Sequence, residues 1–502
     1  MVTAAGTGGQ VRGSSVLLVG QVLALAVGFL VQVLTVRNLT KEDYGAFAWA
    51  LSVVLLAQSL LPLGLDRANA RFLALYDERR DYPRLFGFMA VEAVVILGLG
   101  TAAVAATWAL TGPIGAVAPS QQAVALLAVL IVLAPVQAVD IVVVEMFAVF
   151  ASPWSVFLRR YVLEPLLRLA VVVLLVTGDR GPTFLAAGYV AAAAVGLALY
   201  LVLLRRMFRR IGLASHFRPR ELVLPWREVA GFCGPMLLTT LVAVATTELA
   251  AVVLGQSAGP EEVATFRAVQ PFAALNLVAL YAFTTLFTPA LSRLAARRAG
   301  EEMAGLYWQS ALWVAVLTFP VVAVTTAFAG PFIAFVLGER YATSASVLVI
   351  LSAGYYLNAA LGFNGLTVQI LGRSRWVLLT SVVTLVCAGI AVAVLAPRYE
   401  AVGAAVAVLL TLVVHNVLKQ AGLAGLGIGV WNRQHATVLA SLFAVVLALA
   451  ALGALLDLSL WVALPLVALV WLVVLRQTRG VLRLADAFPE VRKVPVLRRL
   501  LG

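Results

Sequence analysis

Residues 238–289 decide the fold: LTTLVAVATTELAAVVLG (238–255), the turn QSAGPEE (256–262) and FRAVQPFAALNLVALYAFTTLFTP (266–289). Two apolar stretches, each long enough to cross the hydrocarbon core of a bilayer as a helix, flank a turn with Gly, Pro and two acids. The first stretch contains Glu248 and the second contains Arg267. Ionisable groups are costly in hydrocarbon, so they are rare there and usually face a cavity or a partner. This stretch therefore predicts a polytopic membrane protein with a site near Glu248 and Arg267.

The composition also places the chain in a membrane. Of its 502 residues, 63% are hydrophobic and 12% are charged, whereas soluble domains are about half apolar and about a quarter charged. The two cysteines and three histidines lack the spacing of a disulfide framework or a metal site, so we expect no metal and no cofactor. The net charge of +13 would suggest nucleic acid in a soluble protein. In a membrane protein it indicates basic cytoplasmic loops, and we expect no nucleic-acid partner.

Fourteen apolar runs are long enough to be transmembrane helices. The first continues for a full span and lacks a small-residue cleavage site, so we expect a helix there and not a removed signal peptide. The sequence therefore predicts an all-α polytopic membrane protein. The expected spans are 14–36, 44–65, 85–110, 121–150, 155–177, 183–204, 229–254, 263–290, 304–329, 342–370, 375–396, 401–422, 436–456 and 459–476.

The distribution of basic residues predicts the orientation. About 29 of the 36 Lys and Arg residues lie in one set of alternate loops, and about 5 lie in the other set. Basic loops stay in the cytoplasm, so we expect both termini to be cytoplasmic in an inner or plasma membrane protein. An even number of spans agrees with this orientation.

The longest basic loop, residues 205–228, follows the sixth span and divides the chain. It mixes Arg with Met, Phe, Leu and Trp, which suits a segment lying on anionic lipid headgroups. The turns after the first and seventh spans share paired acids followed by an aromatic residue, which indicates two halves of the same topology. We therefore expect an N-terminal lobe over 1–228, a C-terminal lobe over 229–435, and two further helices with a basic tail over 436–502.

The candidate site residues are polar groups inside the expected spans. Arg267 could bind an anion, and Glu248 could take up a proton beside it. The alternative is a Glu–Arg ion pair whose charges only neutralise each other. Asp140 and Glu145 are further candidates for proton or ion coupling. They are five residues apart on the fourth span, so we expect them on different stripes of that helix. Amides of the spans that could line the same site are Gln21, Gln32, Gln270 and Asn276.

Other charged residues have simpler interpretations beside the functional ones. Arg37 could guide an anionic headgroup in an external turn, or it could face water. Arg67 and Arg71, at the inner end of the second span, could receive phosphate at a cytoplasmic mouth, but the positive-inside rule also explains them. Glu164 and Arg168 have the spacing of an ion pair within one helix.

The sequence contains no enzyme motif of the common kinds. It has no Gly-x-Ser-x-Gly and no phosphate-cradling glycine loop. We therefore expect a protein that is not an enzyme, and any transport would draw on an ion gradient, the membrane potential or substrate consumption elsewhere.

Several segments together resemble polysaccharide-type flippases of the multidrug/oligosaccharidyl-lipid/polysaccharide exporter superfamily. The segments are the opening, residues 14–52, the exit of the second span, LPLGLDRANARFLA (61–74), and two pieces of the second half, GPEEVATFRAVQPF (259–272) and LFTPALSRL (286–294). The residues that carry the resemblance are Arg37, Leu39, Asp43, Tyr44, Gly45, Gly64, Leu65, Arg71, Pro289 and Leu291.

The resemblance implies two six-helix lobes arranged in a V, two C-terminal helices, and a central cavity lined by helices one, two, seven and eight. Its implied substrate is an undecaprenyl-pyrophosphate-linked oligosaccharide, flipped from the inner to the outer leaflet by alternating access, and its implied partners include polysaccharide polymerase or export machinery. Arg267 matches the position of a pyrophosphate-binding residue. The chain differs from the family where Glu248 replaces a frequent Asp and Phe266 replaces a Tyr.

Three other functions compete with this one. A cation-coupled multidrug exporter of the same superfamily would need an acidic, aromatic cavity. A glycan polymerase or ligase would need a large external loop, which the sequence lacks. A non-transport membrane assembly partner is the third alternative.

Overall fold

The computed structural model describes residues 4–150, 161–429 and 432–482. Within these ranges the chain is helical, without strands, and eleven helices are long and apolar enough to cross a membrane. The all-α membrane fold predicted from the sequence is confirmed. The chain forms two compact units, residues 1–264 and 265–502, each described here by itself. The lobes expected over 1–228 and 229–435 have a different boundary and stay a prediction.

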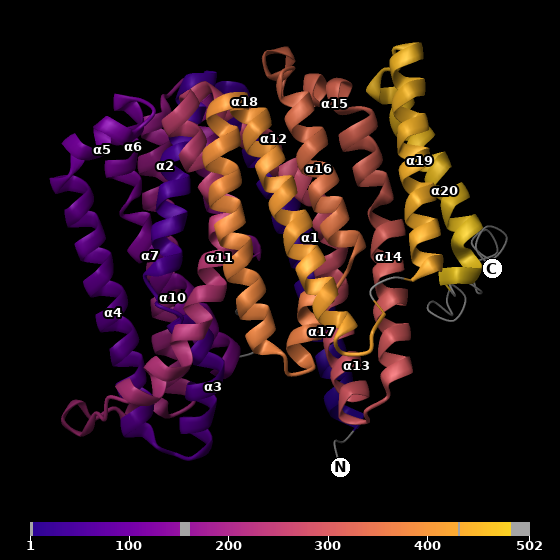
Figure 1. The fold of residues 1–502 in the computed structure, drawn as a ribbon. Helices are drawn as coiled ribbons and strands as arrows, with labels where there is room; N and C mark the ends of the chain where they lie inside the picture. The colour runs from indigo at the N-terminus through magenta and orange to yellow at the C-terminus, as the bar shows by residue number, and fades with distance from the viewer. Residues whose placement is uncertain (1–3, 151–160, 430–431, 483–502) are drawn as a thin grey trace. The chain divides into compact units, whose positions relative to one another are not determined.

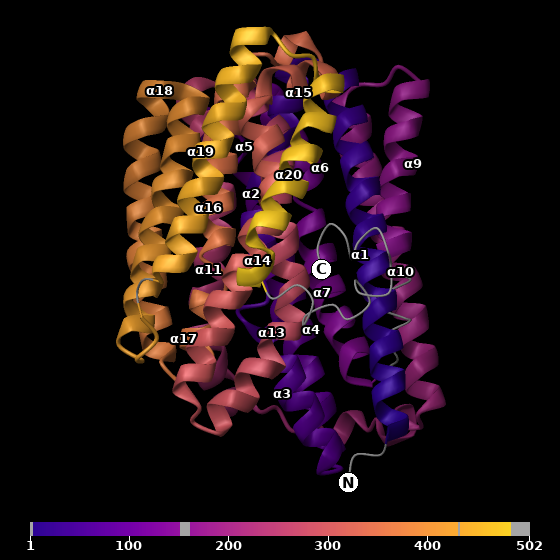
Figure 2. The same ribbon diagram turned by 90° about the vertical axis from the view of Figure 1, so that its right-hand side faces the viewer.

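The first unit is a bundle of long helices, with α1 packed along α9 (Figure 2) and α7 packed between α4 and α10 (Figure 1). Two short 3₁₀ turns (Leu213–His216 and Pro219–Glu221) follow α10. The α-helices are α1 (Ala4–Asn38), α2 (Lys41–Leu60), α3 (Leu65–Glu78), α4 (Tyr82–Ala109), α5 (Thr111–Val117), α6 (Gln121–Leu130), α7 (Leu133–Phe150), α9 (Glu164–Thr177), α10 (Pro182–Arg210), α11 (Trp226–Ala258) and the first part of α12 (Pro260–Ala274).

The second unit begins inside α12 and continues through ten further α-helical and 3₁₀ elements that the structure describes up to residue 482. In it, α14 contacts α13, α16, α19 and α20 and so forms the centre of the packing. The elements are η4 (Leu275–Leu277), α13 (Val278–Ala296), α14 (Gly300–Ala327), α15 (Ala329–Val336), η5 (Glu339–Tyr341), α16 (Ser344–Ala360), α17 (Asn364–Ile370), α18 (Ser374–Ala424), α19 (Arg433–Leu456) and α20 (Leu460–Leu482).

The expected spans coincide with helices, and proline explains how some of them are divided. The expected span 121–150 is two helices, α6 and α7, and Pro135 lies in the first turn of α7, where its missing N–H costs nothing. The expected span 263–290 is interrupted by η4, four residues after Pro271. Part of the expected span 155–177 falls in residues 151–160, outside the described residues, and α9 covers its second part.

Two expected spans, 375–396 and 401–422, are the two halves of α18. The helical path breaks at Glu400, whose φ of 52° is not helical, and Pro397 lies three residues before it. Figure 1 shows one half of α18 ascending and the other descending beside it. The external turn expected between these spans therefore consists of a few residues only.

Close packing of α2 on α11 and on the first residue of α12 requires glycine at two positions. Trp49 donates its indole Nε1–H to the carbonyl of Val252 at 3.1 Å, and a Cβ at Gly255 would collide with the Trp49 ring. A Cβ at Gly45 would likewise collide with the carbonyl oxygen of Pro260. Small residues let helix backbones approach where no hydrophobic force drives them together in lipid. The Tyr-Gly step of the family pattern therefore has a packing role in this chain.

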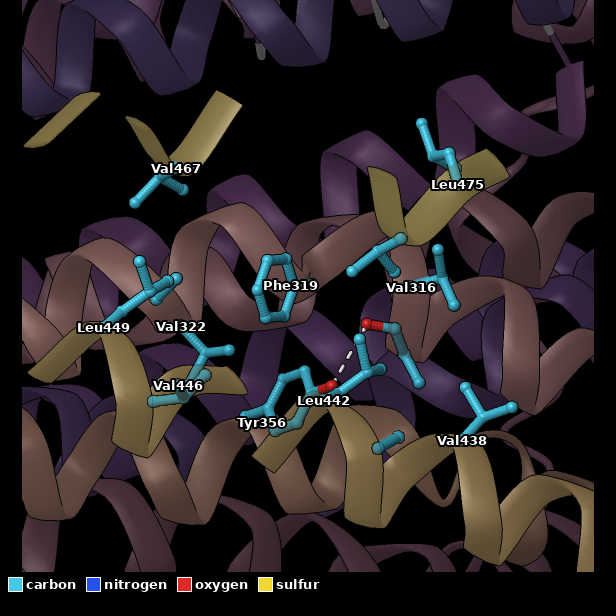
Figure 3. Close-up of a cluster of buried hydrophobic side chains, with 14 of the residues drawn as sticks. Val316, Phe319, Val322, Tyr356, Val438, Leu442, Val446, Leu449, Val467 and Leu475 are labelled. Carbon is cyan, nitrogen blue, oxygen red and sulfur yellow. Dashed lines mark hydrogen bonds between the residues drawn. The ribbon is translucent and has the colours of Figure 1, made fainter. Parts of the chain in front are cut away.

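A buried apolar cluster attaches the last two helices to the second unit (Figure 3). Phe319 of α14 is fully buried between residues of α19 and α20, including Leu442 and Val467. Tyr356 of α16 donates its hydroxyl to the carbonyl of Ala315 at 3.2 Å, which satisfies the polar atom of this buried side chain. The C-terminal helices α19 and α20 are therefore part of the second unit.

We expect Tyr76→Phe to destabilise the first unit by about 1 kcal/mol, the usual net value of one hydrogen bond. The buried Tyr76 of α3 donates its hydroxyl to Glu228 Oε2 of α11 at 3.1 Å. Burial and this carboxylate raise the pKa of Tyr76 from 10.0 to about 12. Because the folded-state pKa is the higher one, the stabilisation is fully present below pH 10.0 and is lost as the pH rises through about 12.

Thermal unfolding of the full chain in detergent tests this expectation. The midpoint of the Tyr76→Phe variant should lie below that of the wild type by the same interval at every neutral pH. Equal midpoints, or an interval that changes around neutrality, would show that this hydrogen bond does not stabilise the fold.

Candidate functional site

Two acids of α7 line a cavity of the first unit. Gln137, Asp140, Ile141, Val144 and Glu145 line this cavity, and their spacing of three and four residues places them along one side of the helix. Asp140 and Glu145 were expected on different stripes. They lie on the two edges of one broad face, and the cavity is wide enough to reach both.

The helix α11 supplies the facing wall. Thr240, Val244, Thr247 and Glu248 line the cavity at helical spacing, and the side chain of Glu248 is buried with 7% exposed. Thr247 donates its hydroxyl to the carbonyl of Val244 at 2.9 Å, one turn earlier in the helix. Glu248, which was singled out from the sequence, therefore lies in a cavity with the acids of α7.

An ion pair on α9 forms a further side. Arg168 donates to Glu164 Oε1 at 2.7 Å, which confirms the ion pair expected within this helix. The guanidinium also lies 5.9 Å from the centre of the Tyr189 ring, within the range of a cation–π contact. Arg168 is thus held in place by Glu164 and by an aromatic ring at the edge of the cavity.

The remaining wall comes from the end of α2 and the start of α3. Leu55, Gln58 and Ser59 belong to α2, Pro62 belongs to the turn, and Asp66 belongs to the first turn of α3. At this turn Gly64 has a φ of 83°, and a Cβ there would press on the carbonyl of Cys233. The glycine lets the turn approach α11 closely and brings Asp66 to the cavity.

The complete cavity is strongly acidic and has a volume of about 650 Å³. Asp66, Asp140, Glu145, Glu164 and Glu248 contribute five carboxyl groups, and Arg168 contributes the single guanidinium of the lining. With all of them ionised, the lining would carry an excess of four negative charges.

Such a lining binds positive charge. Ionised carboxyl groups gathered in one cavity repel one another, and a proton or a cation bound among them reduces this repulsion. Exchange of protons, or of a cation, is therefore the chemistry that this cavity can perform. Among the described residues, no group of three or more His, Cys, Asp and Glu is arranged to hold a metal ion.

Arg267 belongs to the second unit, on the part of α12 that follows residue 264. Its guanidinium donates to Gln270 Oε1 one turn later, and Gln270 Nε2 donates to the hydroxyl of Tyr355 on α16 at 3.4 Å. Gln270 is buried and Arg267 is half-buried. This chain of contacts orients the guanidinium, and a guanidinium presents donors that match phosphate.

Asn276 has a structural role in the same unit. It is fully buried in η4 and donates Nδ2–H to the carbonyl of Ala273 at 2.9 Å. The bond closes the turn that interrupts the helix after Pro271. Asn276 therefore supports the bend that follows Arg267, and its role as a substrate contact stays a prediction.

The candidates on α1 lie in different settings. Gln32 donates Nε2–H to the hydroxyl of Tyr44 on α2 at 2.8 Å, so it ties the two helices together. Gln21 is exposed in the middle of α1, and Arg37 is exposed in the last turn of that helix. None of these three residues lines the acidic cavity.

The arginines expected at a cytoplasmic mouth are on α3. Arg71 is exposed, and its guanidinium lies 5.0 Å from the ring centre of Phe232 and 5.7 Å from that of Phe72. Arg67 belongs to the same helix, but its side chain lies outside the described part of the structure. A phosphate-binding role for this pair stays a prediction.

Sequence reasoning missed part of the acidic cavity. Asp66 lies one position beyond the expected span 44–65 and was not a candidate, although the apolar Gly64–Leu65 step before it signals a turn held against the bundle. Glu164 was considered only as half of an ion pair. The sequence singled out Glu248, Asp140 and Glu145 of this cavity, whereas its candidates Gln21 and Gln32 on α1 do not line it.

Comparisons with known proteins agree with this architecture. The family described as "Polysaccharide biosynthesis protein" matches residues 10–295. A lipid II flippase, MurJ, in an inward closed conformation superposes with a TM-score of 0.72 at 12% identity, covering 91% of this chain and 97% of that one. An inward-facing multidrug transporter of the MATE family superposes with a TM-score of 0.65 at 16% identity, covering 80% of this chain and 94% of that one.

An outward-facing MATE transporter also superposes, with a TM-score of 0.58 at 15% identity, covering 83% of this chain and 95% of that one. No curated protein matches the sequence. The structural likenesses show the fold, and the family match extends over more than half of the chain. The chain belongs to the polysaccharide biosynthesis protein family and has the fold of the flippases and exporters of the multidrug/oligosaccharidyl-lipid/polysaccharide superfamily.

Proposed function

We propose that this protein flips a polyprenyl-pyrophosphate-linked oligosaccharide from the inner to the outer leaflet by alternating access. The family match to polysaccharide biosynthesis supports the substrate class. The positive-inside distribution of basic residues supports an inner or plasma membrane protein with both termini in the cytoplasm. Polysaccharide polymerase or export machinery is then the partner that would take up the flipped product.

The acidic cavity of the first unit is the observation that carries the mechanism. Five carboxyl groups against one guanidinium repel a pyrophosphate, so this cavity is unsuited to the substrate headgroup. It suits the coupling ion, a proton or another cation, that supplies the free energy for transport. Glu248, Asp140 and Glu145 are then the coupling residues, and Asp66 joins them.

Arg267 of the second unit is the proposed contact for the pyrophosphate. Its guanidinium is half-buried and oriented by Gln270, which reduces the conformational freedom that binding must remove. Guanidinium–phosphate contacts are charge-assisted and often bidentate, and they are among the stronger polar contacts. The two units would thus take different charges: a cation in the first and an anion in the second.

A cation-coupled multidrug exporter is the second candidate. The volume of about 650 Å³ lies within the usual range for drug-sized ligands. An acidic lining of this size could hold an organic cation as the substrate itself.

One pair of assays in proteoliposomes separates the two functions. The first follows the accessibility of a fluorescent polyprenyl-pyrophosphate oligosaccharide in each leaflet, and the second follows uptake of a cationic dye. The flippase proposal predicts lipid translocation above that of empty liposomes and dye uptake equal to theirs. Dye uptake without lipid translocation would assign the exporter function.

A further inference from the structure

Glu92 is a buried carboxyl group that the acidic cavity does not include. It lies in the middle of α4 with 1% of its surface exposed, and its partner Asn69 on α3 is fully buried. Asn69 donates Nδ2–H to Glu92 Oε1 at 2.8 Å. Within the described residues this is the one hydrogen bond of the Glu92 carboxyl group, and no basic side chain is found to interact with it.

The two remaining polar atoms of this pair are both without a partner. Glu92 Oε2 and Asn69 Oδ1 are buried, and neither has a hydrogen bond within the described part of the chain. If Glu92 were ionised, both atoms would be acceptors, and each would lose its hydrogen bonds with water without replacement. A buried carboxylate with one amide donor and no cation is also costly in hydrocarbon.

A single proton on Glu92 removes this conflict. The carboxyl and amide groups are flat, and each carries its second polar atom on the same carbon as the first. While Asn69 Nδ2–H donates to Glu92 Oε1, a hydroxyl on Glu92 Oε2 can donate to Asn69 Oδ1. The two hydrogen bonds then close a ring. We propose that Glu92 binds a proton and forms with Asn69 a neutral acid–amide pair that joins α3 to α4.

The surroundings are acidic, which favours the neutral form. Asp66 lies one turn before Asn69 on α3 and lines the acidic cavity. Cys233 of α11 lies near Glu92 as well. The helix α7, which packs on α4, carries Asp140 and Glu145, and both line the acidic cavity, while Arg71 of α3 is exposed. The other helices packed on α4, α5 and α6, carry no ionisable residue. A second negative charge beside Asp66 would therefore be repelled.

This proton site is separate from the cavity but mechanically linked to it. Without the proton, Glu92 Oε2 and Asn69 Oδ1 would both be acceptors and would repel each other. This repulsion would weaken the contact between α3 and α4. Because α3 also carries Asp66, the proton on Glu92 holds one wall of the acidic cavity in place. The inference does not depend on the proposed substrate.

The variant Glu92→Gln tests the pair directly, since an amide at this position can accept from Nδ2 and donate to Oδ1 as the protonated acid does. We expect infrared difference spectra at neutral pH, wild type minus Glu92→Gln, to show the C=O stretch of a protonated carboxyl. Thermal unfolding of this variant should match the wild type, whereas Glu92→Leu and Asn69→Leu should lower the midpoint.

The exposed Glu42 of α2 provides the matched control, because Glu42→Gln should remove only the bands of an ionised carboxylate. Loss of ionised-carboxylate bands in Glu92→Gln would overturn the proposal. Unfolding of Glu92→Gln as early as Glu92→Leu would overturn it as well. Because both readouts use the full chain in detergent and need no transport, they remain decisive if the flippase function fails.

Discussion

Arg267→Ala should slow translocation of the lipid-linked oligosaccharide about ten- to a hundredfold, since a hydrogen-bonded contact to a charged group is worth about 1.5–3 kcal/mol. Gln270 orients the Arg267 guanidinium in the second unit, so the substitution removes a guanidinium that is already held in position for the substrate. Arg267→Lys should retain part of the rate, because an ammonium group keeps the positive charge but cannot form the bidentate hydrogen bonds of a guanidinium. The measurement is the initial rate of leaflet exchange in proteoliposomes.

Arg293→Ala is the matched control for this experiment. Arg293 is an exposed arginine in the last turn of α13 of the same unit, and its loss changes the net charge equally. It should leave the rate unchanged. Equal rates for wild type and Arg267→Ala would remove the arginine from the substrate site.

Glu248→Gln should abolish the response of translocation to an ion gradient while leaving the protein folded. Glu248 is the most buried acid that both the sequence and the cavity single out, and glutamine keeps its size but cannot lose a proton. We expect stimulation by a proton or cation gradient to fall about tenfold or more, equivalent to about 1.4 kcal/mol of lost coupling. The rate measured without a gradient should change much less.

Asp140→Asn extends the test to α7, and Glu42→Gln controls for the loss of an acid outside the cavity. The cavity proposal predicts that Asp140→Asn weakens the gradient response and that Glu42→Gln preserves it. A Glu248→Gln variant with the full wild-type response would show that this carboxyl group does not carry the coupling ion.

The membrane fold could be predicted from the sequence because its signal is local. Apolar runs of about twenty residues, such as those on both sides of residues 256–262, are set by the thickness of the bilayer and need no tertiary information. The ion pair of Glu164 and Arg168 was predictable for the same reason, since four residues along a helix fix its geometry. Pro135 and Pro397 then account for the divisions between α6 and α7 and near Glu400.

The acidic cavity could not be assembled from the sequence because its acids come from four helices. Asp66, Asp140, Glu164 and Glu248 are separated by up to 182 positions in the numbering, and only packing brings them together. The spacing of residues along one helix shows which of them share a side of that helix, but it does not show which other helix packs against that side. A site shared by Glu248 and Arg267 stays a prediction, and the lining that the structure gives Glu248 comes from α2, α3, α7 and α9.

The Glu92–Asn69 pair illustrates the same limit. Glu92 stands out as an acid in an apolar helix, but Asn69 lies in a segment that reads as a basic cytoplasmic exit. The hydrogen bond between them becomes visible only once α3 is packed on α4.

The most direct test of the proposed function is translocation of a fluorescent polyprenyl-pyrophosphate oligosaccharide by the purified wild-type chain in proteoliposomes, with and without an imposed proton or cation gradient. We predict translocation above that of empty liposomes and a faster rate when the gradient is imposed. Translocation equal to that of empty liposomes under both conditions would contradict the proposed function.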